Sequence, residues 1–173
     1  VILGGEYNDV VKALVSNMLV YGGAAQRYFN VNTGDYADKN ITVADVTVPD
    51  DNLSVEVSDQ LDGISFYGAS LVFQSKVAVR FYFKVTGNIA DYTFSTGTPV
   101  AKNGMYYVEV AGINPQQYAD TIALTVNDTM TVYYSPLQYI SRMYTKTENA
   151  DMKALLGAMY TYYLAAGAYE AGS

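Results

Sequence analysis

One stretch of the chain, residues 64–85, reads ISFYGASLVFQSKVAVRFYFKV and constrains the fold more than any other. Apolar residues recur at every second position on both sides of residues 74–75, which is the pattern of two β-strands joined by a tight turn. A two-residue turn and strict alternation place ten side chains on one buried face. The predicted opposite pairs are Ile64 with Val85, Phe66 with Phe83, Gly68 with Phe81, Ser70 with Val79 and Val72 with Val77.

The second face of this predicted hairpin is aromatic and cationic rather than simply hydrophilic. It carries Tyr67, Ala69, Leu71 and Phe73 against Lys76, Ala78, Arg80 and Tyr82. An antiparallel sheet with one solvated side normally alternates more cleanly between apolar and polar residues. Two interpretations follow. Either helices cover this face and its tyrosines lie at a partly solvated boundary between sheet and helices, or the face is an open aromatic platform for a ligand.

Helical periodicity is confined to the two ends of the chain. Apolar residues at three- and four-residue steps predict a helix over residues 7–29 and another over residues 152–169, the latter capped by Thr147 or Asn149. On that last helix Tyr162 falls outside the apolar stripe and is predicted to be exposed. Pro136 is predicted to start a short helix that ends near Tyr144.

Short alternating segments fill the centre of the chain. They predict strands near residues 53–57, 92–95, 105–110, 122–126 and 130–134, with Asn103-Gly104 as a turn and a three-residue loop at 127–129. We therefore predict an α+β fold. Its antiparallel, β-sandwich-like centre of about seven strands is flanked by an N-terminal helix and two C-terminal helices packed on one sheet face. Residues 1–173 are predicted to form a single module excised from a larger protein.

Composition excludes several classes of function. The chain contains no Cys and no His, which argues against ordinary zinc sites, thiol nucleophiles and Ser-His-Asp catalysis. Its net charge of −7 disfavours nucleic acid and anionic membrane surfaces. No apolar run approaches the ~20 residues of a membrane span. The start of the sequence lacks the pattern of a signal peptide.

Carboxylates leave acid–base catalysis as the remaining enzymatic class, because glycosidases need two of them. Most acidic residues fall in predicted turns, where they bond the backbone or face solvent. Glu109 lies within a strand, and a surface position explains it better than catalysis. Residues 50–52, Asp-Asp-Asn, could contribute to a calcium site but lack EF-hand spacing. We predict no catalytic residue, no metal site and no cofactor.

The unusual abundance of tyrosine suggests carbohydrate binding. The chain has 18 Tyr and no Trp, and a Tyr ring offers an apolar face with a polar tip. Tyr67, Arg80 and Tyr82 share the second face of the hairpin, and Tyr107 extends it if its strand is adjacent. These four residues are the predicted ligand-binding site. The acidic net charge predicts a preference for neutral glycans over uronate-rich ones.

Four segments of the chain carry a resemblance to a known family. They read LVSNMLVYGGAAQRYFNVNT, ISFYGASLVFQSKVAVRFYF, VYYSPLQYI and MKALLGAMYTYYLAAGAY, in that order. Together they resemble an uncharacterised extracellular module of large secreted, cell-wall or cellulosome-associated proteins from Gram-positive gut and rumen anaerobes. The family more often has Gly-Ala where this chain has Gly22-Gly23.

The resemblance implies a secreted or cell-surface location beside other domains of the same chain, and it carries over no catalytic residues. We therefore expect a non-catalytic extracellular module that binds polysaccharide, such as that of plant cell walls, or attaches a larger protein to its substrate. The alternative is a structural spacer or protein–protein interaction module in a multidomain surface protein.

Overall fold

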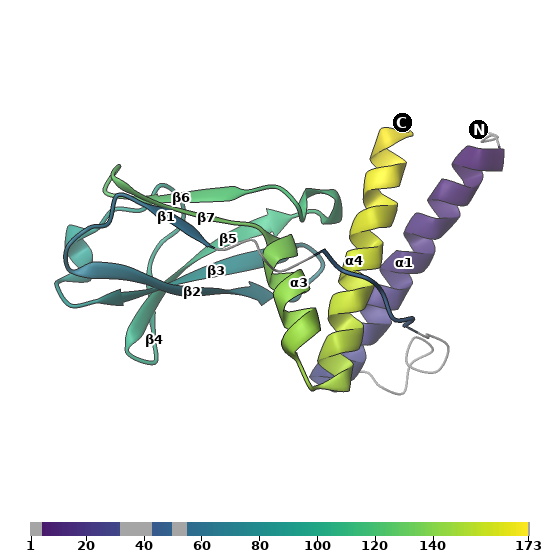
Figure 1. The fold of residues 1–173 in the computed structure, drawn as a ribbon, viewed down its shortest axis with the longest axis horizontal. Coiled ribbons are helices and arrows are strands. Elements are labelled where there is room, and N and C mark those ends of the chain that lie inside the picture. The colour runs from purple at the N-terminus through teal and green to yellow at the C-terminus, as the bar shows by residue number, and fades with distance from the viewer. Residues whose placement is uncertain (1–4, 32–42, 50–54, 173) are drawn as a thin grey trace. The chain divides into compact units, whose positions relative to one another are not determined.

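The computed structural model describes residues 5–31, 43–49 and 55–172. Within them the fold is α+β, with seven antiparallel strands in two sheets, one N-terminal helix and two C-terminal helices (Figure 1). The chain divides into two compact units. The helical unit comprises residues 1–51, 115–117 and 140–173, and the sheet unit comprises residues 52–114 and 118–139.

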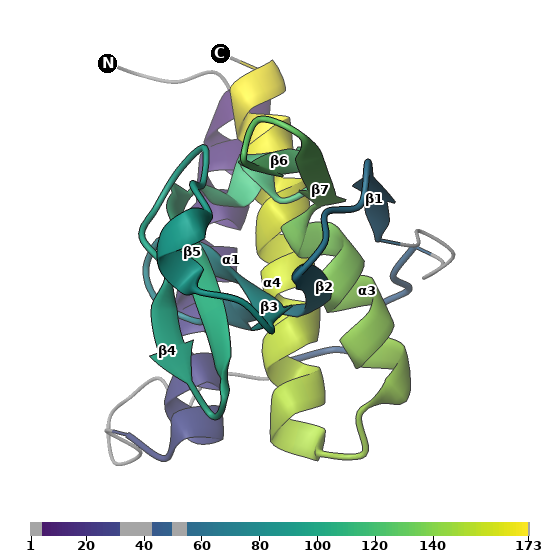
Figure 2. The ribbon, with the colours of Figure 1, turned by 90° about the vertical axis from the view of Figure 1, so that its left-hand side faces the viewer.

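The sheet unit is a β-sandwich of two antiparallel sheets. Its four-stranded sheet has the order β2 (Ile64–Val72), β3 (Val77–Val85), β5 (Met105–Ile113) and β4 (Val100–Lys102). Its three-stranded sheet has the order β1 (Glu56–Ser58), β7 (Met130–Tyr134) and β6 (Ile122–Val126). Figure 2 shows β5 beside β4 and β3 beside β2. A short 3-10 helix, Ile89–Asp91, follows β3.

Aromatic rings fill the space between the two sheets. Phe81 and Phe83 are fully buried, as the alternation in β3 predicts. The ring of Phe81 lies 6.3 Å from that of Tyr134 on β7, and the ring of Phe83 lies 5.6 Å from that of Phe94. Phe94 lies in the predicted strand at 92–95, which is reduced to a single bridge to Val126. These contacts join the two sheets into one core.

The predicted pairing of β2 with β3 is correct at the outer end and wrong at the inner end. Ile64 faces Val85 and Phe66 faces Phe83 as predicted. The register then shifts, because Tyr67 is an extra residue that forms a β-bulge. Beyond the bulge every pair moves by one residue, so Phe81 faces Ala69 and not Gly68.

The bulge also reverses the faces of the inner half of β2. Ala69 and Leu71, predicted on the second face, pair with the core residues Phe81 and Val79. The residues predicted to be in the core now share the second face with Tyr82, Arg80 and Ala78; they are Gly68, Ser70 and Val72. The turn of two residues is replaced by a connection over residues 73–76.

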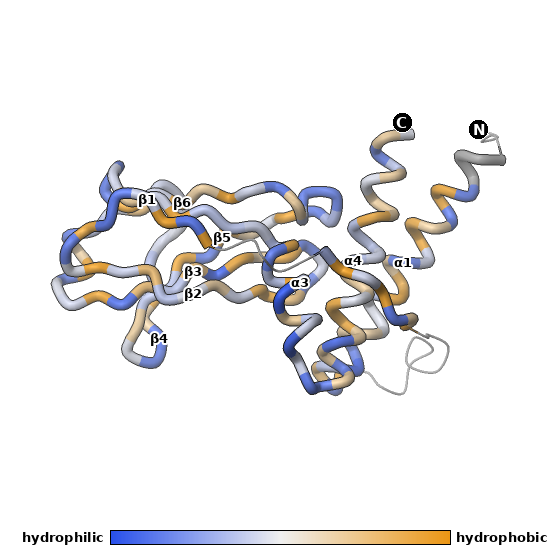
Figure 3. The backbone as a smooth tube through the Cα atoms, in the orientation of Figure 1, coloured by the Kyte–Doolittle hydropathy of each residue, from blue (hydrophilic) through white to orange (hydrophobic). Residues whose placement is uncertain are grey.

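The two other predicted turns are confirmed. The three-residue loop 127–129 pairs Val126 with Met130 and Leu124 with Val132. Asn103 and Gly104 both have positive φ, 52° and 78°, and turn β4 into β5. This turn is one of the hydrophilic segments in Figure 3. Polar turn residues that tolerate positive φ specify these hairpins locally, so they could be read without tertiary information.

The helical unit is built on two long helices that pack against each other, α1 (Gly5–Phe29) and α4 (Ala150–Ala171) (Figure 1). The second half of α3 (Pro136–Lys146), from Ile140, and the 3-10 turn Pro115–Gln117 complete it. Asn149 caps α4 by accepting a hydrogen bond of 2.9 Å from the backbone N–H of Met152, as predicted. Ala24 of α1 is 1% exposed. Its small side chain lets the two helices approach closely.

The prediction that Tyr162 is exposed is wrong. Its side chain is 8% exposed, and its ring stacks on that of Tyr21 of α1 at 5.8 Å. The residues of α4 that are buried lie in a broad band rather than a narrow stripe; they are Leu155, Leu156, Gly157, Ala158, Met159, Tyr162 and Ala166. A helix that is apolar on nearly every side has no periodic signal to identify its buried face.

Alkaline pH is expected to destabilise the helical unit through Tyr21. Burial, with Tyr162 as the smaller cause, raises the pKa of Tyr21 from 10.0 to about 12, and burial also raises the pKa of Tyr162. Stability is then unaffected below the unfolded-state pKa and is lost as pH rises from about 10 to about 12, because the unfolded chain ionises first. Denaturant titrations should show that Tyr21→Phe recovers about 1.4 kcal/mol of the loss between pH 9 and pH 11.

The matched control is Tyr133→Phe, which changes a half-buried tyrosine of the sheet unit. The difference between the two variants isolates the part of the alkaline loss that is specific to Tyr21. An equal loss in the Tyr21→Phe variant and in the parent would show that Tyr21 does not remain protonated in the folded state.

Candidate functional site

The outer face of the four-stranded sheet holds the predicted ligand-binding residues. The register of the strands arranges its side chains in rows across the sheet. The central row contains Gly68, Tyr82, Tyr107 and Val100. One neighbouring row contains Ser70, Arg80 and Glu109. Side-chain alternation places Lys84, Met105 and Lys102 in the row on the other side.

Tyr82, Tyr107 and Arg80 form a contacting cluster at the middle of this face. The two tyrosine rings lie 5.6 Å apart with a tilt of 51°. The guanidinium carbon of Arg80 lies 4.3 Å from the centre of the Tyr107 ring, within the range of a cation–π contact. Packing between these three side chains therefore holds the aromatic rings in fixed orientations.

Glu109 fixes the position of Arg80. The Nε–H of Arg80 donates a hydrogen bond of 2.9 Å to Oε1 of Glu109, and both side chains are about one third exposed or less, at 26% and 35%. This hydrogen bond is the main cause that raises the pKa of Arg80 above its ordinary value. Strands β2, β3, β4 and β5 carry no second carboxylate, so the acid and base pair of a glycosidase is missing from these strands.

Gly68 leaves open space beside the tyrosine pair. It lies opposite Tyr82 in the register, and an added Cβ at this position would meet no atom within 4 Å. A side chain in this place would stand next to the Tyr82 ring, because directly opposed residues have neighbouring Cβ positions. The edge of the Tyr82 ring is therefore accessible from the β2 side of the sheet.

Tyr67 projects from the bulge and is the most exposed large hydrophobic residue of this face, at 59%. The ammonium group of Lys84 lies 4.7 Å from the centre of its ring. Both residues line a shallow hollow of about 440 Å³ on the sheet surface. The other lining residues are Val85, Thr86, Asn103, Gly104 and Met105.

The structure thus brings together all four predicted site residues on one face. Arg80, Tyr82 and Tyr107 are in mutual contact, while Tyr67 belongs to the adjoining hollow with Lys84. Sequence reasoning missed Lys84 and Asn103 as members of the site. Lys84 was identifiable, since it lies two residues beyond Tyr82 on the same strand face, whereas Asn103 reaches the hollow only through the pairing of β4 with β5.

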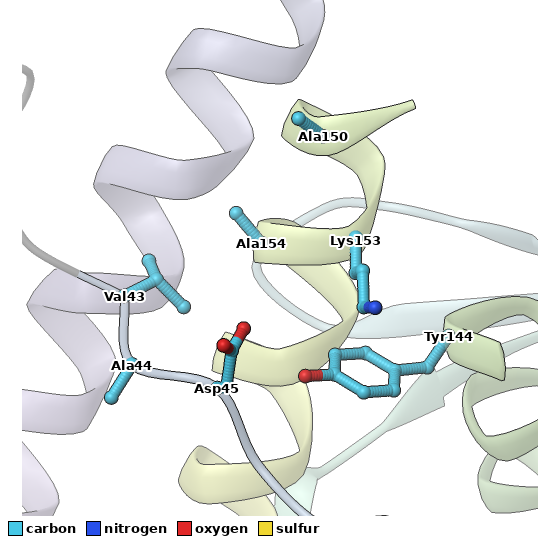
Figure 4. Close-up of a pocket in the computed structure, with 7 residues that line it drawn as sticks. All are labelled: Val43, Ala44, Asp45, Tyr144, Ala150, Lys153 and Ala154. Carbon is cyan, nitrogen blue, oxygen red and sulfur yellow. The ribbon is translucent and has the colours of Figure 1, made fainter. Parts of the chain in front are cut away.

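A second hollow, of about 210 Å³, lies in the helical unit (Figure 4). The extended segment at residues 43–49 crosses the start of α4 there, and the backbone N–H of Val46 donates a hydrogen bond of 3.1 Å to the Tyr144 hydroxyl. The Lys153 ammonium lies 5.0 Å from the centre of the Tyr144 ring. Gly157 packs against Tyr144, where an added Cβ would approach the ring to 3.2 Å. These contacts attach the segment to the helices, so packing alone accounts for the space around Tyr144.

Among the described residues, no group of three or more acidic side chains is placed to hold a metal ion. The possible calcium ligands at residues 50–52 lie outside the described residues. None of the helices in the described part of the chain combines the length and apolarity required to span a membrane.

Comparison with known proteins identifies no relative for this chain: no protein-family model, no curated protein and no solved structure matches it.

Proposed function

We propose that this chain is a non-catalytic extracellular module that binds polysaccharide through the outer face of its four-stranded sheet. The observation that carries the proposal is the aromatic surface made by Tyr67, Tyr82 and Tyr107, with open space at Gly68 opposite Tyr82. The apolar C–H face of a sugar ring packs well on a tyrosine ring, and the hydroxyl of the tyrosine bonds to sugar hydroxyls.

The spacing of the rows suits an extended glycan. Adjacent strands lie about 4.8 Å apart, and residues on one face of a strand lie about 6.8 Å apart. These distances are comparable to the size of a pyranose ring, so neighbouring sugar units can contact neighbouring rows. Arg80 and Glu109 supply polar groups at the border of the aromatic surface, and Asn103 and Thr86 supply them in the hollow. Aromatic surfaces with a few fixed polar groups are typical of ligand sites.

The resemblance to an extracellular module of secreted and cell-wall proteins supports the same proposal. It implies a location where polysaccharides occur, beside domains that such a module would bring to their substrate. Because the exposed aromatic residues lie on the outer surface of the four strands, this is the face that we assign to the glycan.

The test is retention of the protein in gels that contain soluble β-glucan, xylan, mannan or pectin. We expect Tyr82→Ala and Tyr67→Ala each to weaken retention about tenfold, equivalent to ~1.4 kcal/mol. Thermal unfolding should be nearly unchanged for Tyr67→Ala, because its ring is mostly in solvent. Tyr133→Ala is the matched control, since it removes a half-buried tyrosine from the other sheet of the sandwich.

Loss of retention only in the two site variants is the expected outcome. If the parent protein is retained by none of these polysaccharides, the binding proposal fails and the chain is better explained as a structural spacer or a protein–protein interaction module. If Tyr133→Ala weakens retention as much as the site variants do, the glycan binds elsewhere.

A further inference from the structure

The charged residues of the four-stranded sheet are mostly positive, although the whole protein is negatively charged. The chain has a net charge of −7. Yet strands β2, β3, β4 and β5 carry three cations, Arg80, Lys84 and Lys102, and a single carboxylate, Glu109. The three strands of the opposite sheet carry one carboxylate, Glu56, and no cation. The candidate binding face is therefore a locally cationic surface on an acidic protein.

The cations of this face differ in whether they are already paired. Arg80 is neutralised by Glu109 at 2.9 Å. Lys84 contacts the Tyr67 ring, and among the described residues no carboxylate pairs with it or with Lys102. A cation–π contact leaves the three N–H donors of an ammonium group available to other acceptors. Lys84 and Lys102 can thus bind an anion that approaches from solvent.

The two lysines lie in one row across the sheet, and Lys84 lines the hollow. Lys84 lines the hollow together with Tyr67, and Lys102 lies in the same row on the far side of Met105. They are separated by two strand spacings, which is about 10 Å. An aromatic ring for a sugar face and two separated cations for negative groups therefore occur on one surface.

We infer that the glycan recognised at this face is a uronate-bearing polysaccharide, whose sugar rings stack on Tyr67 and whose carboxylates bind Lys84 and Lys102. This inference rests on the proposed function and names the chemical class of its ligand. It reverses the expectation from net charge, which predicted neutral glycans. The charges close to the site determine which glycan binds, because charges on a surface are screened beyond a distance of about 8–10 Å at ordinary ionic strength.

The test compares polygalacturonate with the same polymer after methyl esterification, which keeps the sugar chain and removes its charge. Polyglutamate provides carboxylates without sugar rings. We expect the parent protein to bind polygalacturonate more tightly than either comparison polymer. Binding should fall steeply in about 1 M NaCl, where the Debye length is about 3 Å.

Site variants separate local charge from total charge. Lys84→Gln and Lys102→Gln should each weaken polygalacturonate binding about fivefold, the upper range for an exposed ion pair. Both should weaken binding of the methyl-esterified polymer less than binding of polygalacturonate, because Lys84 also contacts the Tyr67 ring on which the sugar stacks. Lys12→Gln, on α1 in the helical unit, changes the net charge equally and should have no effect. Tyr67→Ala should weaken binding of both polymers.

The outcomes distinguish this inference from the proposal on which it rests. Equal or tighter binding of the esterified polymer overturns the inference and leaves polysaccharide binding intact. Binding of polyglutamate as tight as that of polygalacturonate also overturns it, because the lysines would then act as a general anion surface. Failure to bind any glycan overturns the proposed function itself.

Discussion

Phe81→Ala is expected to lower the free energy of unfolding by about 3–5 kcal/mol, the usual range for truncating a buried phenylalanine. Phe81 is 0% exposed and lies between the sheets, 6.3 Å from Tyr134 and 6.3 Å from Phe66. Its opposite neighbour in β2 is Ala69, which is too small to fill the cavity. Urea titration followed by tyrosine fluorescence or near-UV circular dichroism would measure the loss.

The matched control is Val100→Ala on β4 of the same sheet. Val100 is 45% exposed, so its truncation should change stability by no more than about 0.5 kcal/mol. A loss below about 1 kcal/mol for Phe81→Ala would mean that the two faces of β3 are assigned in reverse.

Deletion of residues 152–173 is expected to remove more helix than the deleted segment contains. Helix α4 spans 22 residues and is the packing partner of the 25-residue α1. Alone, α1 loses the contacts that bury Tyr21 and Ala24. Its two adjacent glycines, Gly22 and Gly23, cost about 1 kcal/mol each in a helix interior. Because most helical stability in proteins comes from packing, α1 should unfold or aggregate.

Far-UV circular dichroism at 222 nm measures this effect directly. The expected decrease corresponds to the helical residues of α4 and α1 together, and the truncated chain should associate in sedimentation experiments through its exposed apolar side chains. Removal of residues 172 and 173 alone is the control, since both follow the end of α4. A soluble, cooperatively unfolding truncation that retains the signal of α1 would contradict the dependence of α1 on α4.

Local patterns were sufficient for most of the elements. Alternation identified β3, β6 and β7 because each has one buried face, and the pairing around loop 127–129 followed from keeping that face apolar. The sequence predicted a helix end where a capping residue marks it, as Asn149 does for α4. The inner half of β2 was not readable, because a bulge at Tyr67 is indistinguishable from continued alternation when Gly68, Ala69 and Ser70 are all small.

The same limit explains the error on Tyr162. Periodicity assigns a buried face only when a helix has a polar face for contrast, and α4 has none over residues 155–166. Which tyrosine enters the interface was decided by Tyr21 of α1, whose ring provides the stacking partner. That contact joins residues 141 positions apart in sequence, so it exists only in the folded unit.

For the candidate site, the sequence by itself determined which residue types share a strand: Arg80, Tyr82 and Lys84 alternate along β3 and must lie on one face. Only the tertiary structure decided what surrounds them. Pairing of β5 with β3 placed Tyr107 against Tyr82 and Glu109 against Arg80, and pairing of β4 with β5 added Lys102. Net charge is a sum over the chain, whereas a ligand responds to the charges within a screening length of its site. An acidic sequence can therefore fold into a protein with one cationic sheet face, and only the arrangement of its strands reveals that face.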